Sequence, residues 1–593
     1  MKFLKLFGLI IFITGFFIFN ASIFWADYTL TRNIVEEKVA DSTKRKVFLS
    51  EASLLLDREV GSNFEFVKQL SLIFKNINDK LVKDFRISDA ELRTLAERSS
   101  KTFSLTEVDS VFRTSNETAA FKNKAFKEFG KQLEGRTFDS KEELAKELRN
   151  VSDKIAAYGI TNKLGFDRYA QKDLKYALTK AAADSPVKRN PSLYMFLTFG
   201  LCILGALVYI LPKAAQSEGI KNNNIFFNPM KNVGWLGVLT GTWLIAFYIV
   251  LYFYPEYMTN WIIMVDPVST LLNGHEAGRF FLYGFIYTLC ILVMGVRMII
   301  HYRHSRYQIF RTLSVMFFQT AFAFLIPEFL IRLNKPYFDF KNIWPLDYSF
   351  FFDYRINQFI ENGTLGIFML GWGIALIVIA VPVLVYFFGK RWYCSWVCGC
   401  GGLAETLGDP YRQLSNKKLK AWKIERWMVH GVLAFAIFMT VAVLYTYWTG
   451  SSWFLVVDTY TLREVYGLLI GAGFAGVVGT GFYPFMGNRV WCRFGCPLAA
   501  YLGLVQRFKS RFRITTNGGQ CISCGNCSTY CEMGIDVRWY AQRGQNIIRS
   551  SCVGCGICSS VCPRGVLNLE LKDEEGRFGK PILIGNNNIK VDA

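Results

Sequence analysis

Histidine is scarce in this sequence, with four in 593 residues, and residues 27–190 contain neither histidine nor cysteine. The absence of cysteine excludes a disulfide framework from that segment. It also removes the usual ligands of zinc and haem, so we expect the segment to bind no metal cofactor. Haem elsewhere would need axial histidines from facing helices, whereas His301 and His304 lie among basic residues at the end of an apolar run, which favours an interfacial position.

Two other classes of protein lack support in the sequence. A GxGxxG string does occur, at residues 471–476, but it lies inside an apolar run, where small residues serve close helix packing. The formal charge is +21, yet the basic residues gather beside the ends of apolar runs, including a stretch at residues 507–513. With no recognition module beside them, these residues indicate a membrane surface and no nucleic-acid partner.

Long apolar runs are abundant, in a chain that is 52% hydrophobic. Runs of 18 or more residues recur, and each is long enough to cross a bilayer core of about 30 Å. We therefore predict a mainly α, polytopic helical membrane protein whose partner is the lipid bilayer. About eight spans are expected, at residues 3–26, 192–212, 234–254, 280–300, 312–331, 364–388, 427–449 and 464–486.

The flanking charges predict the topology. The first run follows Lys2 and Lys5 and lacks an A-x-A cleavage site, which favours an uncleaved anchor with its basic end inside. Loops with Lys213, Lys221 and Lys231, and later basic loops, would then be cytoplasmic, as would both chain ends. The predicted parts are an anchor (1–26), an extracytoplasmic helical domain (27–190), a membrane domain (191–505), a cytoplasmic α+β ferredoxin-like domain (506–570) and a tail (571–593).

The predicted extracytoplasmic domain carries helix signals. Ser140 with Glu143 and Ser88 with Glu91 have capping-box spacing. After the first box, apolar residues fall on one helical face until Gly159, which can end the helix. We expect this domain to be mostly helical and to act as a passive spacer or a docking site for a partner.

Eight of the fifteen cysteines form two CxxCxxCxxxC runs near the end of the chain. This spacing delivers three thiolates to one 4Fe-4S cluster and the fourth to a second cluster. Zinc sites usually pair CxxC halves across a longer spacer, and a cytoplasmic location keeps thiols reduced. We predict two 4Fe-4S clusters with crossed ligation, one held by Cys521, Cys524, Cys527 and Cys562 and the other by Cys552, Cys555, Cys558 and Cys531.

A second set of cysteines forms an internal repeat. GKRWYCSWVC at residues 389–398 matches GNRVWCRFGC at residues 487–496, and each unit directly follows an apolar run. Cysteines four apart would lie on one helical face, so two facing units would present four sulfurs. We expect a further metal centre at the membrane edge, with packing cysteines as the alternative. Cys400 has no counterpart in the second unit and either replaces a ligand or adds a fifth sulfur. The four repeat cysteines are Cys394, Cys398, Cys492 and Cys496.

The CxxxCP motif at Cys492–Pro497, its partial twin and the two-cluster tail together resemble the NapH and NosR type of membrane polyferredoxin, a group that also includes the CcoG-type proteins of cytochrome oxidase maturation. The resemblance covers about residues 364–565. It implies a bacterial inner-membrane protein that moves electrons between quinones or cytoplasmic donors and respiratory enzymes. The sequence departs from the pattern at Gly399 and at Glu532, where proline is usual. No Ser/Thr-Gly-Ala-Thr flavinylation motif occurs in residues 27–190, so covalent FMN is not supported.

We therefore expect a single-electron relay that works with redox partner proteins and is not necessarily an enzyme with its own substrate; no catalytic residue can be assigned. Quinol is a candidate partner, and Glu328 and Arg332 at the end of one span are either involved in its deprotonation or form an interfacial ion pair. Two alternatives remain open. One is an assembly factor that reduces a metal or cysteine for a respiratory oxidase, and the other is a redox sensor.

Overall fold

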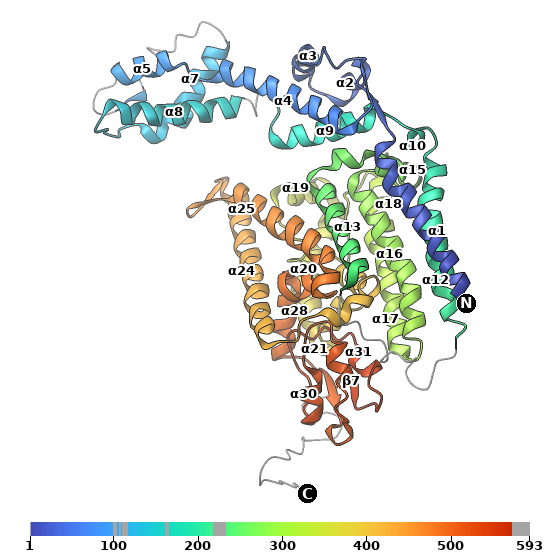
Figure 1. Cartoon of the computed structure of the whole chain (residues 1–593). Helices are drawn as coiled ribbons and strands as arrows, with labels where there is room; N and C mark the ends of the chain where they lie inside the picture. The colour runs from blue at the N-terminus through green and yellow to red at the C-terminus, as the bar shows by residue number, and fades with distance from the viewer. Residues whose placement is uncertain are drawn as a thin grey trace. The chain divides into compact units, whose positions relative to one another are not determined.

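A computed structural model describes residues 2–98, 103–105, 108, 117–159, 165–216 and 233–571. The loop residues Lys221 and Lys231 and the predicted tail beyond residue 571 lie outside these ranges. Helix makes up 72% of the structure, which confirms the mainly α prediction. The described chain divides into two compact units, one of residues 20–191 and 255–264 and the other containing the remaining residues (Figure 1).

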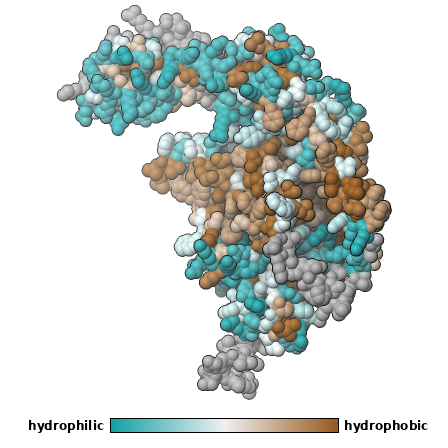
Figure 2. Space-filling model, viewed as in Figure 1, coloured by the Kyte–Doolittle hydropathy of each residue, from teal (hydrophilic) through white to brown (hydrophobic). Residues whose placement is uncertain are grey.

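Among the described residues, eight helices are long and apolar enough to cross a membrane, which agrees with the predicted number of candidate spans and is compatible with a multi-pass membrane protein. Figure 2 shows apolar side chains gathered over these helices on the visible face. The largest difference from the predicted bounds is at the start of the seventh span. That helix begins at Leu419, earlier than predicted, because it includes a basic turn at the membrane interface that hydropathy alone excludes. The helices cover Lys2–Phe24, Pro191–Lys213, Gly234–Phe253, Arg279–His301, Arg306–Arg332, Gly363–Phe388, Leu419–Thr449 and Thr459–Gly481.

The eighth span ends earlier than predicted. It stops at Gly481, and a separate short helix, α27 (Tyr483–Met486), follows with Pro484 in its first turn. Proline lacks the amide hydrogen that would continue the preceding helix, which explains the break. The GxGxxG string lies inside this span: the Gly471 backbone lies against the Tyr348 ring and Gly476 against Tyr252, confirming that these glycines serve packing.

The unit of residues 20–191 and 255–264 is mostly helical, as predicted. A small three-stranded antiparallel sheet in the order β2-β1-β3, absent from the prediction, joins its distant ends. Residues 255–264 also belong here, although the sequence placed them in the membrane domain. The elements are β1 (Asp27–Thr29), α2 (Arg32–Lys38), α3 (Ser42–Glu51), β2 (Glu59–Val60), α4 (Asn63–Phe85), α5 (Asp89–Arg98), α7 (Glu117–Phe129), α8 (Lys141–Gly159), α9 (Arg168–Ala182), β3 (Ala183–Asp184), α10 (Pro186–Arg189) and α14 (Thr259–Ile263).

Both predicted capping boxes form. The Glu143 amide donates to Ser140 Oγ at 3.1 Å at the start of α8, and the predicted apolar face of that helix is buried. At the start of α5 the box is reciprocal, because the Glu91 amide donates to Ser88 Oγ at 3.3 Å and the Ser88 amide donates to Glu91 Oε2 at 2.9 Å. Each box satisfies amides that the first helical turn leaves without partners.

Replacing Ser88 by alanine should therefore loosen α5. Loss of a capping side chain costs about 1 kcal/mol, which corresponds to roughly fivefold faster amide exchange in the helix. Hydrogen-exchange mass spectrometry of the full chain measures this rate. Thr94→Ala is the matched control, since Thr94 Oγ1 donates to Ala90 O within the same helix and caps nothing. Equal acceleration in both variants would contradict the capping role.

The other unit carries the cysteines. Its last part pairs β6 (Phe512–Thr516) with β7 (Leu567–Leu571) in an antiparallel register from Phe512↔Leu571 to Thr516↔Leu567. Three short helices lie between the strands, α29 (Asn526–Thr529), α30 (Val537–Gln542) and α31 (Ile557–Ser560), which agrees with the predicted α+β fold. Arg513, expected at a membrane surface, is instead buried within β6.

The remaining elements of this unit form the helical part that carries the membrane-edge cysteines. They are α1 (Lys2–Ala21), α11 (Pro191–Met195), α12 (Leu201–Ile210), α13 (Gly234–Phe253), α15 (Asp266–Asn273), α16 (Arg279–His301), α17 (Arg306–Phe317), α18 (Ile326–Arg332), α19 (Asp353–Glu361), α20 (Gly363–Ala375), α21 (Val381–Phe388), α22 (Arg391–Cys394), α23 (Gly399–Thr406), α24 (Leu419–Thr449), β4 (Trp453–Phe454), β5 (Val457–Asp458), α25 (Thr459–Tyr466), α26 (Gly479–Gly481) and α28 (Pro497–Phe508).

Candidate metal centres

The eight cysteines of the two CxxCxxCxxxC runs line two separate cavities, with empty volumes of about 360 and 390 Å³. Each cavity takes three cysteines from one run and the last cysteine of the other run. This is the grouping that crossed ligation requires. The smaller cavity is lined by Cys521, Cys524, Cys527 and Cys562, and the larger by Cys531, Cys552, Cys555 and Cys558.

The two runs follow the same backbone path. The residue before the second cysteine has a positive φ in each run, 59° at Ser523 and 63° at Gly554. The residue after it does so as well, with 78° at Gly525 and 73° at Gly556. Left-handed residues on either side of a cysteine turn the chain tightly, so that three side chains converge on one point. The matching turns explain why two distant segments build two similar cavities.

The chemistry of these cavities suits thiolates that share positive metal ions. Burial raises the pKa of Cys527 to about 12 and that of Cys552 to about 11. A buried thiol with such a pKa ionises at neutral pH only if a cation accompanies the charge. Backbone amides also point at the sulfurs, since the Ile535 amide donates to Cys531 Sγ at 3.4 Å. The residues present therefore fit iron–sulfur clusters.

The CxxxC repeat is a repeat of structure as well as of sequence. Each unit begins at a glycine with positive φ, 66° at Gly389 and 91° at Gly487. In each, the amide of the second cysteine donates to the carbonyl five residues earlier, Cys398 to Tyr393 at 2.8 Å and Cys496 to Trp491 at 2.9 Å. The prediction of one supersecondary piece used twice is confirmed.

The predicted helical face of the CxxxC units was wrong. Cys398 and Cys496 have extended backbones, with ψ of 126° and 111°, and each is the N-cap of the following helix, α23 or α28. The chain therefore leaves the helical path between the two cysteines of each unit. The sulfurs still meet, because one cavity of about 270 Å³ is lined by Cys394, Cys398, Cys400, Cys492 and Cys496.

Cys400 adds a fifth sulfur beside the four cysteines of the repeat. A hydrogen bond with Cys400 lowers the pKa of Cys398 to about 6, against the opposing effect of burial. The partner thiol, which donates that bond, has a pKa well above its usual value. Burial raises the pKa of Cys394 to about 12. Cys398 therefore ionises more readily than Cys394 and Cys400.

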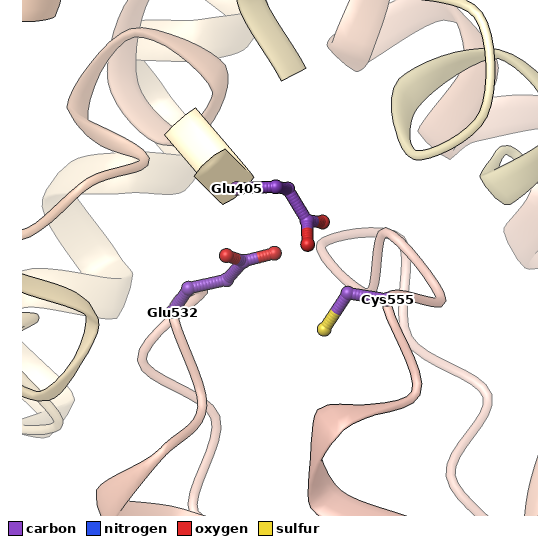
Figure 3. Close-up of side chains that lie close together, drawn as sticks. All are labelled: Glu405, Glu532 and Cys555. Carbon is purple, nitrogen blue, oxygen red and sulfur yellow. The ribbon is translucent and has the colours of Figure 1, made fainter. Parts of the chain in front are cut away.

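Two buried carboxylates, Glu405 and Glu532, lie close together beside Cys555 (Figure 3). They belong to a buried network of charges. Glu405 forms salt bridges with Arg311, Arg412 and Arg489. Burial alone would raise the pKa of Glu405, but these guanidinium groups outweigh it and lower the pKa to about 2. Glu532, next to Cys531, accepts from Arg412 at 2.7 Å and lies 3.1 Å from Arg489 Nε.

This network gives Glu532 a structural role that a proline at the same position could not fill. A proline after Cys531 would leave two buried guanidinium groups with less countercharge. Glu405 and Glu532 also lie within 4.8 Å of Cys555 Sγ, an arrangement of three potential ligands, but both carboxylates are already paired with arginines. Glu405 and Arg489 were not predicted from the sequence. The signal for Arg489 was the arginine at the same place in each repeat, Arg391 and Arg489, whereas Glu405 lies outside the repeat.

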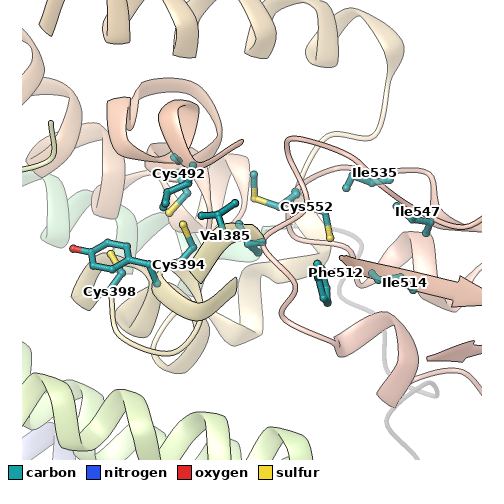
Figure 4. Close-up of a cluster of buried hydrophobic side chains, with 14 of the residues drawn as sticks. Val385, Cys394, Cys398, Cys492, Phe512, Ile514, Ile535, Ile547 and Cys552 are labelled. Carbon is teal, nitrogen blue, oxygen red and sulfur yellow. The ribbon is translucent and has the colours of Figure 1, made fainter. Parts of the chain in front are cut away.

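The membrane-edge and larger ferredoxin cavities belong to one buried core (Figure 4). Arg489 Nη1 donates to Cys394 O at 3.2 Å and to Cys492 Sγ at 3.5 Å, while its other side meets Glu532. Ser395 Oγ donates to Val553 O at 2.8 Å, directly joining the two cysteine-bearing loops. The cavities are therefore held in fixed relation by hydrogen bonds and ion pairs, without intervening solvent-exposed linkers.

Three other predicted residues have different surroundings from those expected. Glu328 and Arg332 do not form an ion pair: Glu328 Oε2 accepts from Asn273 at 2.6 Å, and Arg332 bonds to Leu271 O. His301 Nδ1 lies 3.2 Å from Asp409 Oδ2, a carboxylate that also pairs with Arg297, so this ring has an acidic partner that the sequence did not predict.

Two families of iron–sulfur domains match this chain. A 4Fe-4S binding domain matches residues 370–421 and 467–515, the segments that carry the CxxxC repeat and Cys400. A 4Fe-4S dicluster domain matches residues 509–567, which contain all eight ferredoxin cysteines. The chain thus contains ferredoxin-type 4Fe-4S domains, and iron–sulfur clusters are the cofactors that these domains support.

Curated relatives include YccM of Escherichia coli (strain K12), a protein named for electron transport, which is 28% identical over 28% of this chain and 47% of its own length. MauN, a methylamine utilization ferredoxin-type protein, is 30% identical in Paracoccus denitrificans (strain Pd 1222) over 27% of this chain and 56% of its own length. The chain spans about half the length of these relatives and is homologous to such electron transport proteins. No solved structure matches.

Proposed function

We propose that this protein is a membrane-bound iron–sulfur protein that relays single electrons between the quinone pool or a cytoplasmic donor and a respiratory reductase. The observation that carries the proposal is the buried core shared by the membrane-edge cysteines and the ferredoxin cysteines. Eight apolar helices attach this core to a bilayer. We place the protein in the bacterial inner membrane, as the resemblance implies, with the ferredoxin part on the cytoplasmic side, which the distribution of basic residues favours.

We propose crossed ligation for the two ferredoxin clusters. The cysteines that share each cavity support this assignment. When bound, such clusters supply reversible one-electron redox chemistry. The chain's own contribution is to bury the sulfurs and to donate amide hydrogen bonds to them, which together set the reduction potential. It also holds the cavities in fixed relation to one another.

We further propose that the membrane-edge cavity holds a third cluster. Four repeat cysteines converge there, and the matched 4Fe-4S domain covers these segments. Cys400 is then a hydrogen-bond donor to Cys398 and not itself a ligand. Arg489, which donates to Cys492 Sγ, places a fixed positive charge beside the centre and should raise its reduction potential.

The roles of Cys398 and Cys400 predict different outcomes for two neighbouring variants. Cys398→Ser should lose the third cluster, lowering iron from about twelve to about eight per chain, since each cluster contributes four. Cys400→Ala should keep the iron but shift the potential of that centre negative, because a hydrogen bond to sulfur is lost. Iron analysis and an EPR-monitored redox titration measure these effects. Iron loss in Cys400→Ala with retention in Cys398→Ser would reverse the assignment.

The relay itself is tested by adding menaquinol or ubiquinol to the oxidised, anaerobically purified protein and following cluster reduction by EPR. We expect quinol to reduce at least one centre. A chemical reductant provides the control that the clusters are competent to accept electrons. Clusters that respond to the chemical reductant but never to quinol would contradict a quinol-driven relay.

A further inference from the structure

A basic cleft lies beside the membrane-edge cysteines, at the end of α24 where that span begins. Its walls come from the first turns of α24, from α28 and from residues 548–551 of the ferredoxin part. The cleft is open to solvent on one side. Cys492 and Met533 also line it, so the cleft borders both the third proposed centre and the loop after Cys531.

The charges of this basic cleft are strongly unbalanced. A single carboxylate, Glu425, lines it, and that group already accepts a hydrogen bond from Arg493 at 2.7 Å. With histidine neutral, five cations and one anion leave a net charge of +4. The cations are Lys390, Arg426, Arg493, Arg507 and Arg549. Such a concentration of one charge in a partly enclosed space attracts an anion.

One of these cations has a buried donor without a partner among the described residues. Arg493 Nη2 is buried and makes no hydrogen bond there. Lys390, which also lines the cleft, is only 2% exposed. A buried donor without a partner is costly, and a buried charge more so, which makes an anionic ligand in the cleft energetically favourable.

The arginines are also held in orientation. The guanidinium groups of Arg426 and Arg549 stack on the Trp422 ring at 5.2 and 5.0 Å, and Arg549 lies 6.0 Å from the Tyr540 ring as well. A stacked guanidinium group loses little conformational freedom when it binds a ligand. Its planar set of N–H donors also matches the geometry of phosphate oxygens. The hydroxyl-bearing Ser550 and Ser551 also line the cleft.

We propose that this basic cleft binds the phosphate group of an anionic ligand. Its place at the end of a span suits the headgroup of an anionic phospholipid, since basic pockets between helices at a membrane surface bind such headgroups. A soluble phosphate ester offers the same chemistry from the aqueous side. In either case the bound negative charge would lie next to Cys492 and should shift the potential of the adjacent centre negative.

The test uses the full chain, purified anaerobically in neutral detergent. Phosphatidylglycerol is titrated and bound lipid is counted by native mass spectrometry, with phosphatidylcholine as the neutral comparison. In a second arm, thermal stability is measured in sodium phosphate and in sodium chloride of equal ionic strength. Arg426→Gln/Arg549→Gln should weaken phosphatidylglycerol binding about 30-fold, since each basic group at a membrane surface contributes roughly fivefold.

The matched control is Lys420→Gln/Lys423→Gln, which removes two exposed cations from the same helix end but outside the basic cleft. Iron content shows whether each variant is assembled. Lipid binding lost only in the arginine variant supports the phospholipid source. Stabilisation by phosphate alone, lost in the same variant, supports a soluble source. Absence of both effects, or equal losses in the two variants, would overturn the proposal.

Discussion

Cys531→Ser is expected to remove the cluster held by the second cysteine run, lowering iron by about four atoms per chain, although Cys531 belongs to the first run. The reason is that its side chain lines the cavity of Cys552, Cys555 and Cys558. Serine oxygen is a harder ligand than thiolate and holds iron less well in such a site. Iron and acid-labile sulfide, measured on anaerobically purified protein, give the count.

Double variants distinguish crossed from uncrossed ligation. Cys531→Ser/Cys552→Ser should lose no more iron than either single variant, because both residues serve one cavity. Cys531→Ser/Cys521→Ser should lose about eight irons, because the two residues serve different cavities. Cys202→Ser, a change in the second span far from either run in sequence, is the control and should lose none. The opposite pattern of additivity would mean that each run ligates its own cluster.

Arg489→Gln is the second change with a large expected effect. It leaves Glu405 and Glu532 buried with less countercharge, and removal of one member of a buried ion pair costs about 3–5 kcal/mol. It also removes the positive charge beside Cys492, so the potential of the membrane-edge centre should shift negative. Thermal unfolding and a redox titration measure the two effects separately.

A second substitution tests the origin of this effect. Glu405→Gln alone should also lower the stability of the protein. The double variant Arg489→Gln/Glu405→Gln should lose less stability than the two single variants added together, because both charges of the buried pair are removed. Arg543→Gln is the control for a general loss of charge, since Arg543 is exposed on the ferredoxin part. Strict additivity of the two buried variants would show that the network does not couple these residues.

The sequence predicted the features that depend on composition and spacing. Apolar length was enough to find all eight candidate spans, because the bilayer sets a nearly fixed length. The cysteine spacing placed Cys531 with the second run, since a tight loop delivers only three of its four thiolates to one point. The repeat at Cys394 and Cys492 was visible because its residues match one another.

The features that depend on tertiary contact could not be predicted. Helical periodicity placed Cys394 and Cys398 on one face, but Cys398 adopts the extended backbone of a helix N-cap. Glu405 and Glu532 are 127 positions apart in the sequence and meet only through the fold, so no local pattern joins them. The short strands β1 and β3 likewise pair residues from opposite ends of a long segment.

We propose that four of the five cysteines at the membrane edge, Cys394, Cys398, Cys492 and Cys496, hold a third cluster in addition to the two of the ferredoxin part. Iron and acid-labile sulfide per chain, measured on the anaerobically purified wild-type protein, test it most directly. We predict about twelve of each, four per cluster. About eight of each, with both ferredoxin clusters intact by EPR, would contradict it.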